Sequence, residues 1–249
     1  MTHPSDPFAH HPELRGQIAD PETSFFRTFD VEALLQAHPH LTDLRDWVYS
    51  DAEREAIRRD ALAGHDGDLW IFGYGSLMWD PALRFAELRR ARLEGYARRL
   101  ILLDDKGGRG TKEAPGLMAA LDDGPGCDGL AFRIAAADVE IETEILFRRE
   151  MIGPGYLPIL HPVVLADQTV SALVFVADHG EAVILSDICR DRQLRYLATG
   201  AGLLGTSRDY LASIVDHFCQ FGIEDAHCSA LLREVDARIA ATTAEDATP

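Results

Sequence analysis

The chain has 249 residues, of which 47% are hydrophobic, and a formal net charge of −17. This length suits one large domain, or one medium domain with an extension, and the apolar content is sufficient for a sizeable core. So strong a negative charge argues against binding to a nucleic-acid backbone or to an anionic membrane surface. An anionic metabolite is still compatible with it, if backbone N–H groups or a few arginines provide a local site.

The cysteines give no sign of a metal or redox motif, because none of them forms a C-x-x-C pair. They are Cys127, Cys189, Cys219 and Cys228. The sequence begins without a basic and apolar signal segment, and no apolar run reaches membrane length. We therefore expect a cytoplasmic protein with free cysteines, no membrane contact and no obligate protein partner. The histidine pairs at 10–11 and 38–40 lack partners at ligand spacing, so we expect no metal site.

The first 66 residues are predicted to form a partly disordered tail and a helical extension. Residues 1–23 are rich in Pro, His and Asp, and we expect them to be poorly ordered. A helical pattern covers residues 31–63, with Asp30 and Thr42 as candidate caps. Its apolar face would come from Leu44, Trp47, Val48 and Ile57. We place the main domain at residues 67–241 and a disordered tail at 242–249.

Strand patterns gather in the middle of the chain and helical patterns lie toward its end. After an apolar strand at 69–72, we expect strands at 92–103, 117–121, 130–134, 163–165 and 170–176, the last two as a hairpin. Helices are expected at 186–198, 207–221 and 225–239, with caps at 206–207 and 224–225. This order predicts an α+β protein, since a doubly wound fold would alternate strands and helices.

The segment L-W-I-F-G-Y-G-S-L-M-W at residues 69–79 is the most informative stretch of the chain. Its bulky apolar start predicts a buried strand, and Gly73 and Gly75 then break it. Glycine tolerates positive φ and lets another group approach the backbone closely. The loop could therefore turn successive N–H groups toward an anion. The alternative is an ordinary glycine turn without a ligand.

Residues 138–150, D-V-E-I-E-T-E-I-L-F-R-R-E, predict an amphipathic helix. Its apolar positions are Ile141, Ile145 and Leu146. The acidic residues between them are expected to form the solvated side of the helix: Glu140, Glu142 and Glu144.

Glu150 differs from these glutamates because it continues the apolar stripe, four residues after Leu146. It also lies at the expected helix end, where the macrodipole disfavours a carboxylate. Partial burial and the dipole would both raise its pKa, which suits a general base. The alternative is a structural glutamate paired with Arg148 or Arg149.

Four motifs, in this order, resemble the ChaC family, the glutathione-specific γ-glutamylcyclotransferases. They are F-G-Y-G-S-L-M-W at 72–79, G-R-G-T at 108–111, R-E at 149–150 with G-Y-L-P at 155–158, and G-T-S-R-D-Y-L at 205–211. The resemblance covers about residues 69–235. It implies a γ-glutamylcyclotransferase-like fold, in which helices surround a small mixed β-barrel or curved sheet. It also implies that no metal or organic cofactor is needed.

The resemblance further implies cleavage of glutathione to 5-oxoproline and cysteinylglycine, with Glu150 as the catalytic general acid/base. The strand end and glycine loop would bind the substrate, through Ile71, Phe72, Gly73, Tyr74, Gly75, Ser76 and Leu77. Arg109 and Tyr210 are further candidate substrate contacts, although Tyr74 and Tyr210 could equally be core residues.

Three alternatives stay open at this point. A serine or cysteine nucleophile is one, but Ser76 lacks the G-x-S-x-G pattern and no cysteine has a supporting motif. A cyclotransferase acting on other γ-glutamyl amines or peptides is the second. The third is a non-catalytic regulatory protein, against which Glu150 beside an intact glycine loop argues.

Overall fold

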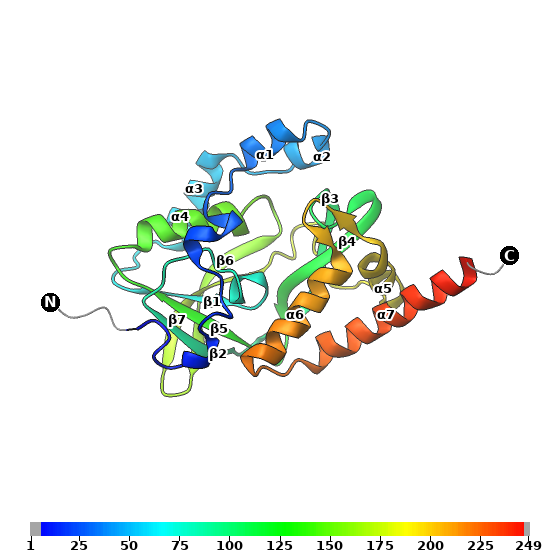
Figure 1. Cartoon of the computed structure of the whole chain (residues 1–249). Coiled ribbons are helices and arrows are strands. Elements are labelled where there is room, and N and C mark those ends of the chain that lie inside the picture. Colours follow the sequence, from blue (N-terminus) through cyan, green and yellow to red (C-terminus); the bar gives the residue numbers. More distant parts are fainter. Residues whose placement is uncertain (1–5, 247–249) are drawn as a thin grey trace.

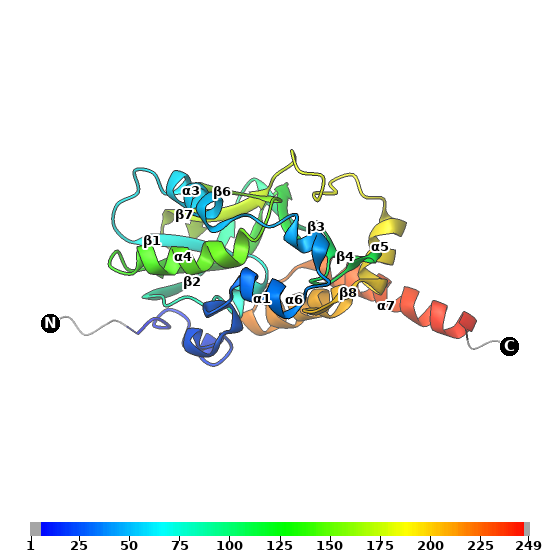
Figure 2. The same cartoon turned by 90° about the horizontal axis from the view of Figure 1, so that it is seen from above.

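A computed structural model describes residues 6–246 of the chain. Its centre is a closed barrel with the strand order β1-β5-β2-β6-β7, seen from two directions in Figures 1 and 2. The strands are β1 (Leu69–Gly73), β2 (Glu87–Leu93), β5 (Cys127–Ile134), β6 (Tyr156–Leu165) and β7 (Thr169–Ala177). β1 runs parallel to β7, and the other pairs are antiparallel. The expected small mixed barrel is therefore confirmed, as is the β6–β7 hairpin.

A second, two-stranded ribbon of β3 (Tyr96–Lys106) and β4 (Thr111–Asp123) stands beside the barrel. One strand was expected over residues 92–103, but the chain turns between β2 and β3 at Gly95, where φ is +83°. Glycine allows this left-handed turn without strain. The C-terminal helices lie along the ribbon in Figure 1: α5 (Arg190–Thr199), α6 (Ser207–Phe221) and α7 (Ala226–Asp246). Two short strands, β8 (Ala201–Gly202) and β9 (Gly205–Thr206), precede α6.

The side chains of β1 enter two different cores, which explains why this strand is a continuous apolar run. Phe72 packs in the main core, which joins the barrel to the C-terminal helices through residues such as Phe218. Ile71 points the other way, into a core shared with Leu146 and Phe147. Successive side chains of a strand face opposite sides, so a strand covered on both sides is apolar at every position.

The helix α4 (Val139–Glu150) forms as predicted, with Glu140 and Glu144 on its exposed side, but Glu142 is not exposed with them. Glu142 is only 1% exposed, whereas Ile141 is 56% exposed. The expectation that Glu142 is solvated is therefore wrong. The reason is Arg27, whose guanidinium binds both carboxylate oxygens of Glu142 at 2.6 and 2.9 Å. An ion pair of this kind offsets part of the cost of burying the charge.

The N-terminal segment is more ordered than its composition suggests. Residues 1–5 lie outside the described residues, but residues 6–23, expected to be poorly ordered, follow the barrel and bury Leu14 completely in the main core. Three short 3-10 turns occur here: η1 (Pro12–Leu14), η2 (Pro21–Thr23) and η3 (Phe25–Arg27). At the other end, α7 continues through Asp246, so residues 242–246 are helical, and 247–249 lie outside the described residues.

The rest of the extension consists of α1 (Val31–Ala37), α2 (Thr42–Arg45) and α3 (Asp51–Ala61). Asp30 caps α1 as predicted, but Thr42 is the first residue of α2 and not its cap. The second strong cap is instead Ser50, which forms a capping box with Glu53. In Figure 1 these helices lie along the top of the molecule, from α4 toward the tips of β3 and β4.

No helix within residues 6–246 combines the length and apolarity needed to cross a bilayer.

Candidate active site

A cavity of about 310 Å³ lies where the glycine loop, the end of α4, the tips of β3 and β4, and the N-terminal extension meet. Sites for small ligands commonly enclose about 300–1,000 Å³. Most of the residues predicted for the site line it, together with Arg149 and Tyr156. The predicted ones are Tyr74, Gly75, Ser76, Leu77, Arg109, Glu150 and Tyr210.

The glycine loop connects β1 to the 3-10 turn η4 (Ser76–Met78). The first backbone hydrogen bond of this turn runs from the Met78 amide to the Gly75 carbonyl at 2.9 Å. The amides of Gly75, Ser76 and Leu77 therefore have no carbonyl partner within the turn, as at any helix start. These three N–H groups belong to residues that line the cavity.

The glycine at position 75 is required for space and not for a left-handed backbone. Its φ is −135°, so the positive φ that glycine tolerates is not used there. A Cβ at Gly75 would lie 3.0 Å from the hydroxyl of Tyr210, closer than most side chains tolerate. The loop is also held from behind by buried Arg98, which donates to the carbonyl of Tyr74 and pairs with Asp225 at 2.6 Å. These contacts make the loop a fixed wall of the cavity.

Glu150 is the last residue of α4, and its side chain is only 14% exposed. Burial raises the pKa of its carboxyl, and the charge and hydrogen bond of Arg149 partly oppose that shift. The sequence offered a raised pKa and a pairing with Arg149 as alternatives for Glu150, and the structure has both. Arg148 instead donates to the carbonyl of Arg27 at 3.3 Å.

Arg149 connects Glu150 to the glycine loop. Its Nε lies 2.9 Å from Glu150 Oε1, one Nη donates to Ser76 Oγ at 2.8 Å, and the other donates to the carbonyl of Asp80. The Cζ atom of the guanidinium lies over the ring of Phe26, 4.2 Å from its centre. The sequence indicated Arg149 only as a possible partner of Glu150. Its contacts to the loop and to Phe26 join segments far apart in the sequence, which no local pattern reveals.

Three tyrosines surround Glu150: Tyr74 of the glycine loop and Tyr210 of α6 are buried, and Tyr156 of β6 is half-buried. Burial is the main cause that raises the pKa of each tyrosine, and the charge of Glu150 adds to each shift. The pKa of Tyr210 is raised to about 12. All three are therefore neutral hydroxyls near pH 7. Tyr156 donates to the carbonyl of Ala119 at 2.7 Å. Tyr156 was not among the predicted site residues, although the G-Y-L-P motif contains it.

Arg109 also lines the cavity, at the turn between β3 and β4. Its guanidinium stacks 4.6 Å from the ring centre of Tyr210 and donates to the carbonyl of Leu204 at 2.7 Å. Desolvation lowers the pKa of Arg109 from its usual value, but an arginine remains charged. Its backbone N–H is bound by the buried carboxyl of Asp104, which fixes the turn.

Other predicted residues stand away from the cavity. Ile71 and Phe72 are fully buried in β1, and neither they nor Gly73 line the cavity. A ligand in the cavity would therefore meet the loop after β1 and not these side chains. No histidine or cysteine lines the cavity in the described part of the chain, so Ser76 has Arg149 and no general base as its side-chain partner.

Among the described residues, no group of three or more His, Cys, Asp or Glu side chains is placed to hold a metal ion.

The barrel and its helices define the fold of γ-glutamylcyclotransferases. A crystal structure of a selenomethionine-labelled γ-glutamyl cyclotransferase specific to glutathione from yeast superposes with a TM-score of 0.62, covering 69% of this chain and 97% of that one. The two sequences are 20% identical, so this likeness concerns the fold.

Residues 69–238 match the family of ChaC-like proteins, and the chain belongs to this family. A glutathione-specific γ-glutamylcyclotransferase of Escherichia coli (strain K12) is 38% identical over 191 residues, which are 76% of this chain and 82% of that protein. The glutathione-specific γ-glutamylcyclotransferase 1 of Homo sapiens is 30% identical over 181 residues, 69% of this chain and 81% of that one.

Proposed function

We propose that this protein is a γ-glutamylcyclotransferase that cleaves glutathione to 5-oxoproline and L-cysteinylglycine. The observation that carries the proposal is the buried carboxyl of Glu150, which lines the same cavity as the residues of the glycine loop whose amides start the 3-10 turn. The names of the relatives from E. coli and human support glutathione as the substrate.

The reaction is an internal displacement within the γ-glutamyl group. The α-amine attacks its own γ-carbonyl carbon and forms the C–N bond of the five-membered lactam. The amide bond to cysteinylglycine then breaks. Glu150 accepts a proton from the attacking amine and returns it to the leaving nitrogen, so no water is consumed. A positioned acid/base of this kind contributes about 10²–10⁴-fold to the rate.

The loop and the arginines supply the remaining functions. The amides of Gly75, Ser76 and Leu77 bind the α-carboxylate of the substrate, or the oxyanion that develops on the γ-carbonyl. The neutral hydroxyls of Tyr74 and Tyr210 can donate to the same groups. Arg109, at the turn between β3 and β4, offers a positive charge to the anionic remainder of the substrate. Holding the γ-glutamyl arm in a folded conformation supplies a further rate gain through proximity.

The test is incubation of the purified full chain with reduced glutathione, with 5-oxoproline and cysteinylglycine detected by mass. A panel of γ-glutamyl amines and γ-glutamyl amino acids separates glutathione from the other cyclotransferase substrates. Formation of both products from glutathione at a higher kcat/KM than from the panel supports the proposal. Binding of glutathione without turnover would favour the regulatory alternative.

A cytoplasmic location and the independence from a protein partner stay predictions from the sequence.

A further inference from the structure

One wall of the cavity comes from outside the segment that matches the family. Phe26, Leu41 and Trp47 belong to the N-terminal extension, whereas the family match begins at residue 69. Leu41 packs against the backbone at Gly107, and the Trp47 ring packs against Gly153, so the extension contacts both sides of the cavity mouth. The extension is therefore structurally part of the site that the family domain forms.

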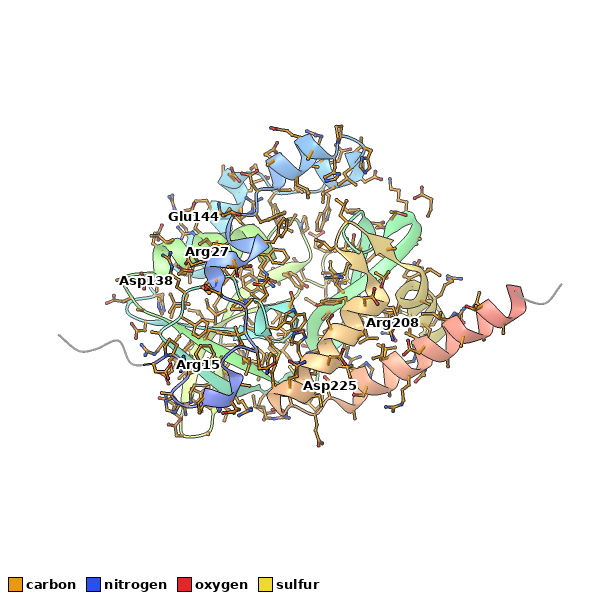
Figure 3. All side chains as sticks on the ribbon, viewed as in Figure 1. Arg15, Arg27, Asp138, Glu144, Arg208 and Asp225 are labelled. Carbon is orange, nitrogen blue, oxygen red and sulfur yellow. The ribbon has the colours of Figure 1, made fainter. Side chains whose placement is uncertain are left out.

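The extension is fixed to the helix that ends in Glu150. Arg27 makes the buried two-pronged pair with Glu142 in the middle of α4, and in Figure 3 its side chain lies between the N-terminal segment and this helix. Near the C-terminal end of the same helix, Arg54 of α3 donates to the carbonyl of Met151 at 3.0 Å. These contacts hold η3, and with it Phe26, at a defined place over the end of α4.

Phe26 covers the face of the Arg149 guanidinium, and polar groups occupy its edges. Glu150, Ser76 and the carbonyl of Asp80 bind the N–H groups, whereas the ring of Phe26 lies against the plane at 4.2 Å. Such a cation–π contact is stronger when water is excluded, and Arg149 is buried. The planar cation is thus restrained both along its edges and from one face.

We propose that Phe26 is a positioning residue of the active site, whose ring holds the Arg149 guanidinium against Glu150 and Ser76. The N-terminal extension is then a working part of this enzyme, since it sets the orientation of the charge beside the catalytic carboxylate. The inference rests on the proposed function only for the catalytic role of Glu150.

The positioning role of Phe26 can be measured through the pKa of Glu150, because this pKa depends on the charges around the carboxyl. Arg149 faces it from its own helix, and the neutral hydroxyls of Tyr74, Tyr156 and Tyr210 face it from the loop, β6 and α6. Among these groups Arg149 carries the positive charge, which favours the ionised carboxylate. If the guanidinium moves away, the pKa of Glu150 rises further.

The experiment compares three variants of the full chain with the wild type. Phe26→Leu keeps the apolar bulk but removes the aromatic face, whereas Phe26→Tyr keeps the face. Leu35→Ala is the control, because Leu35 is buried in the apolar cluster of the extension and does not line the cavity. Truncating it removes apolar contacts from the cluster against which Phe26 also packs, but leaves the Phe26 ring and every polar partner of Arg149 in place. Circular dichroism verifies folding, and Phe26→Met replaces the leucine variant if the latter does not fold.

Two readouts are measured for each variant. One is the acidic limb of kcat/KM against pH with glutathione. The other is the titration of the Glu150 carboxyl by ¹³C NMR, assigned through the signal that Glu150→Gln lacks, which requires no turnover. We expect both midpoints to rise by about half a unit or more in Phe26→Leu, since a nearby opposite charge shifts a carboxyl by about 1–3 units. We expect both to stay at the wild-type value in Phe26→Tyr and Leu35→Ala.

An unchanged NMR midpoint in Phe26→Leu would overturn the inference. A shift in Leu35→Ala as large as that in Phe26→Leu would also overturn it, because the effect would then come from docking of the whole extension. A wild-type protein that leaves glutathione intact would contradict the proposed function instead. The NMR titration would still decide the role of Phe26 in that case.

Discussion

At the scale of single side chains, the proposed chemistry depends on two adjacent residues, Arg149 and Glu150. Burial raises the pKa of Glu150, and Arg149 limits that rise. The raised pKa makes the carboxyl a stronger base, while the positive charge of Arg149 favours the ionised form that can accept a proton. A fully exposed glutamate would be too weak a base, and an unpaired buried one would stay protonated.

Replacing Glu150 with Gln is expected to lower kcat by at least about 100-fold, because the amide is nearly isosteric but cannot accept a proton. The measurement is 5-oxoproline formation, with circular dichroism to show that the variant is folded. A folded Glu150→Gln protein that retains more than about a tenth of the wild-type activity would contradict the role of Glu150 as the base.

The pH dependence follows from the same residue. Burial raises the pKa of Glu150 above the ordinary glutamate value of 4.5, and the proposed mechanism needs the deprotonated carboxylate. We therefore expect activity to fall as the pH drops through this raised pKa, with the acidic limb of kcat/KM above pH 4.5. A pH profile of the wild-type enzyme measures the limb directly. A midpoint at or below the ordinary value would show that the titrating group is not Glu150.

Gly75 and Ser76 give contrasting predictions. A valine at position 75 would collide with the Tyr210 hydroxyl and displace the loop, so we expect kcat/KM to fall by about 100-fold. Ser76→Ala removes one hydrogen bond to Arg149, and we expect a milder loss of about tenfold. Steady-state kinetics of both variants, with intact-mass analysis of the wild type, provide the measurement. A covalent γ-glutamyl adduct that Ser76→Ala abolishes would instead support the nucleophile alternative.

At the scale of elements, α4 is held between the barrel and the N-terminal extension. Its apolar side packs Ile145, Leu146 and Phe147 against β1 and β7, and its other side receives the ion pair of Glu142 with Arg27. This two-sided support fixes the end of the helix, where Glu150 lies. A helix docked on one side only would leave that carboxylate free to move.

The buried pair predicts a clear difference between two glutamates of the same helix. Glu142→Gln removes the buried partner of Arg27 and leaves it only the longer, 3.8 Å pairing with exposed Glu22, so we expect the free energy of unfolding to fall by about 3 kcal/mol. Glu144→Gln is the control, because Glu144 is exposed on α4, and we expect a change within about 0.5 kcal/mol. Urea unfolding of both variants measures this, and equal stabilities would mean that the pair does not stabilise the docked extension.

For the whole molecule, the cavity depends on parts that are distant along the chain. The barrel supplies the glycine loop, α4 supplies Arg149 and Glu150, the β3–β4 ribbon supplies Arg109, and the extension supplies Phe26. The ion pair of Asp43 with Lys112, at 2.6 Å, joins the extension to the ribbon on the far side. The site is thus complete only when all of these parts are assembled.

Treatment with a chelator tests whether the assembled site needs a metal ion for the reaction. The reaction proposed here uses proton transfer and backbone N–H groups, so we expect glutathione turnover to be unchanged after dialysis against EDTA. The assay is 5-oxoproline formation before and after treatment. A loss of activity that a divalent cation restores would show that a metal takes part, contrary to the prediction from ligand spacing.

Local physical chemistry let the sequence determine much of this protein. The apolar run of β1, the break at the glycine loop, the span of α6 and the caps at Asp30 and Thr206 all depend on neighbours within a few residues, and the structure has each of them. The burial of Glu150 was also predictable, because helical periodicity places it on the apolar stripe. The order of the four motifs gave the family and its fold.

The tertiary structure alone decided which distant groups meet. Glu142 is inside because Arg27, 115 positions earlier in the chain, lies against it, and Phe26 reaches Arg149 through the same docking. Gly75 is needed because Tyr210 comes within reach of its Cα, and not because of its own φ. Periodicity describes which face of an element is apolar, but the partner of a buried charge comes from the packing of the whole chain.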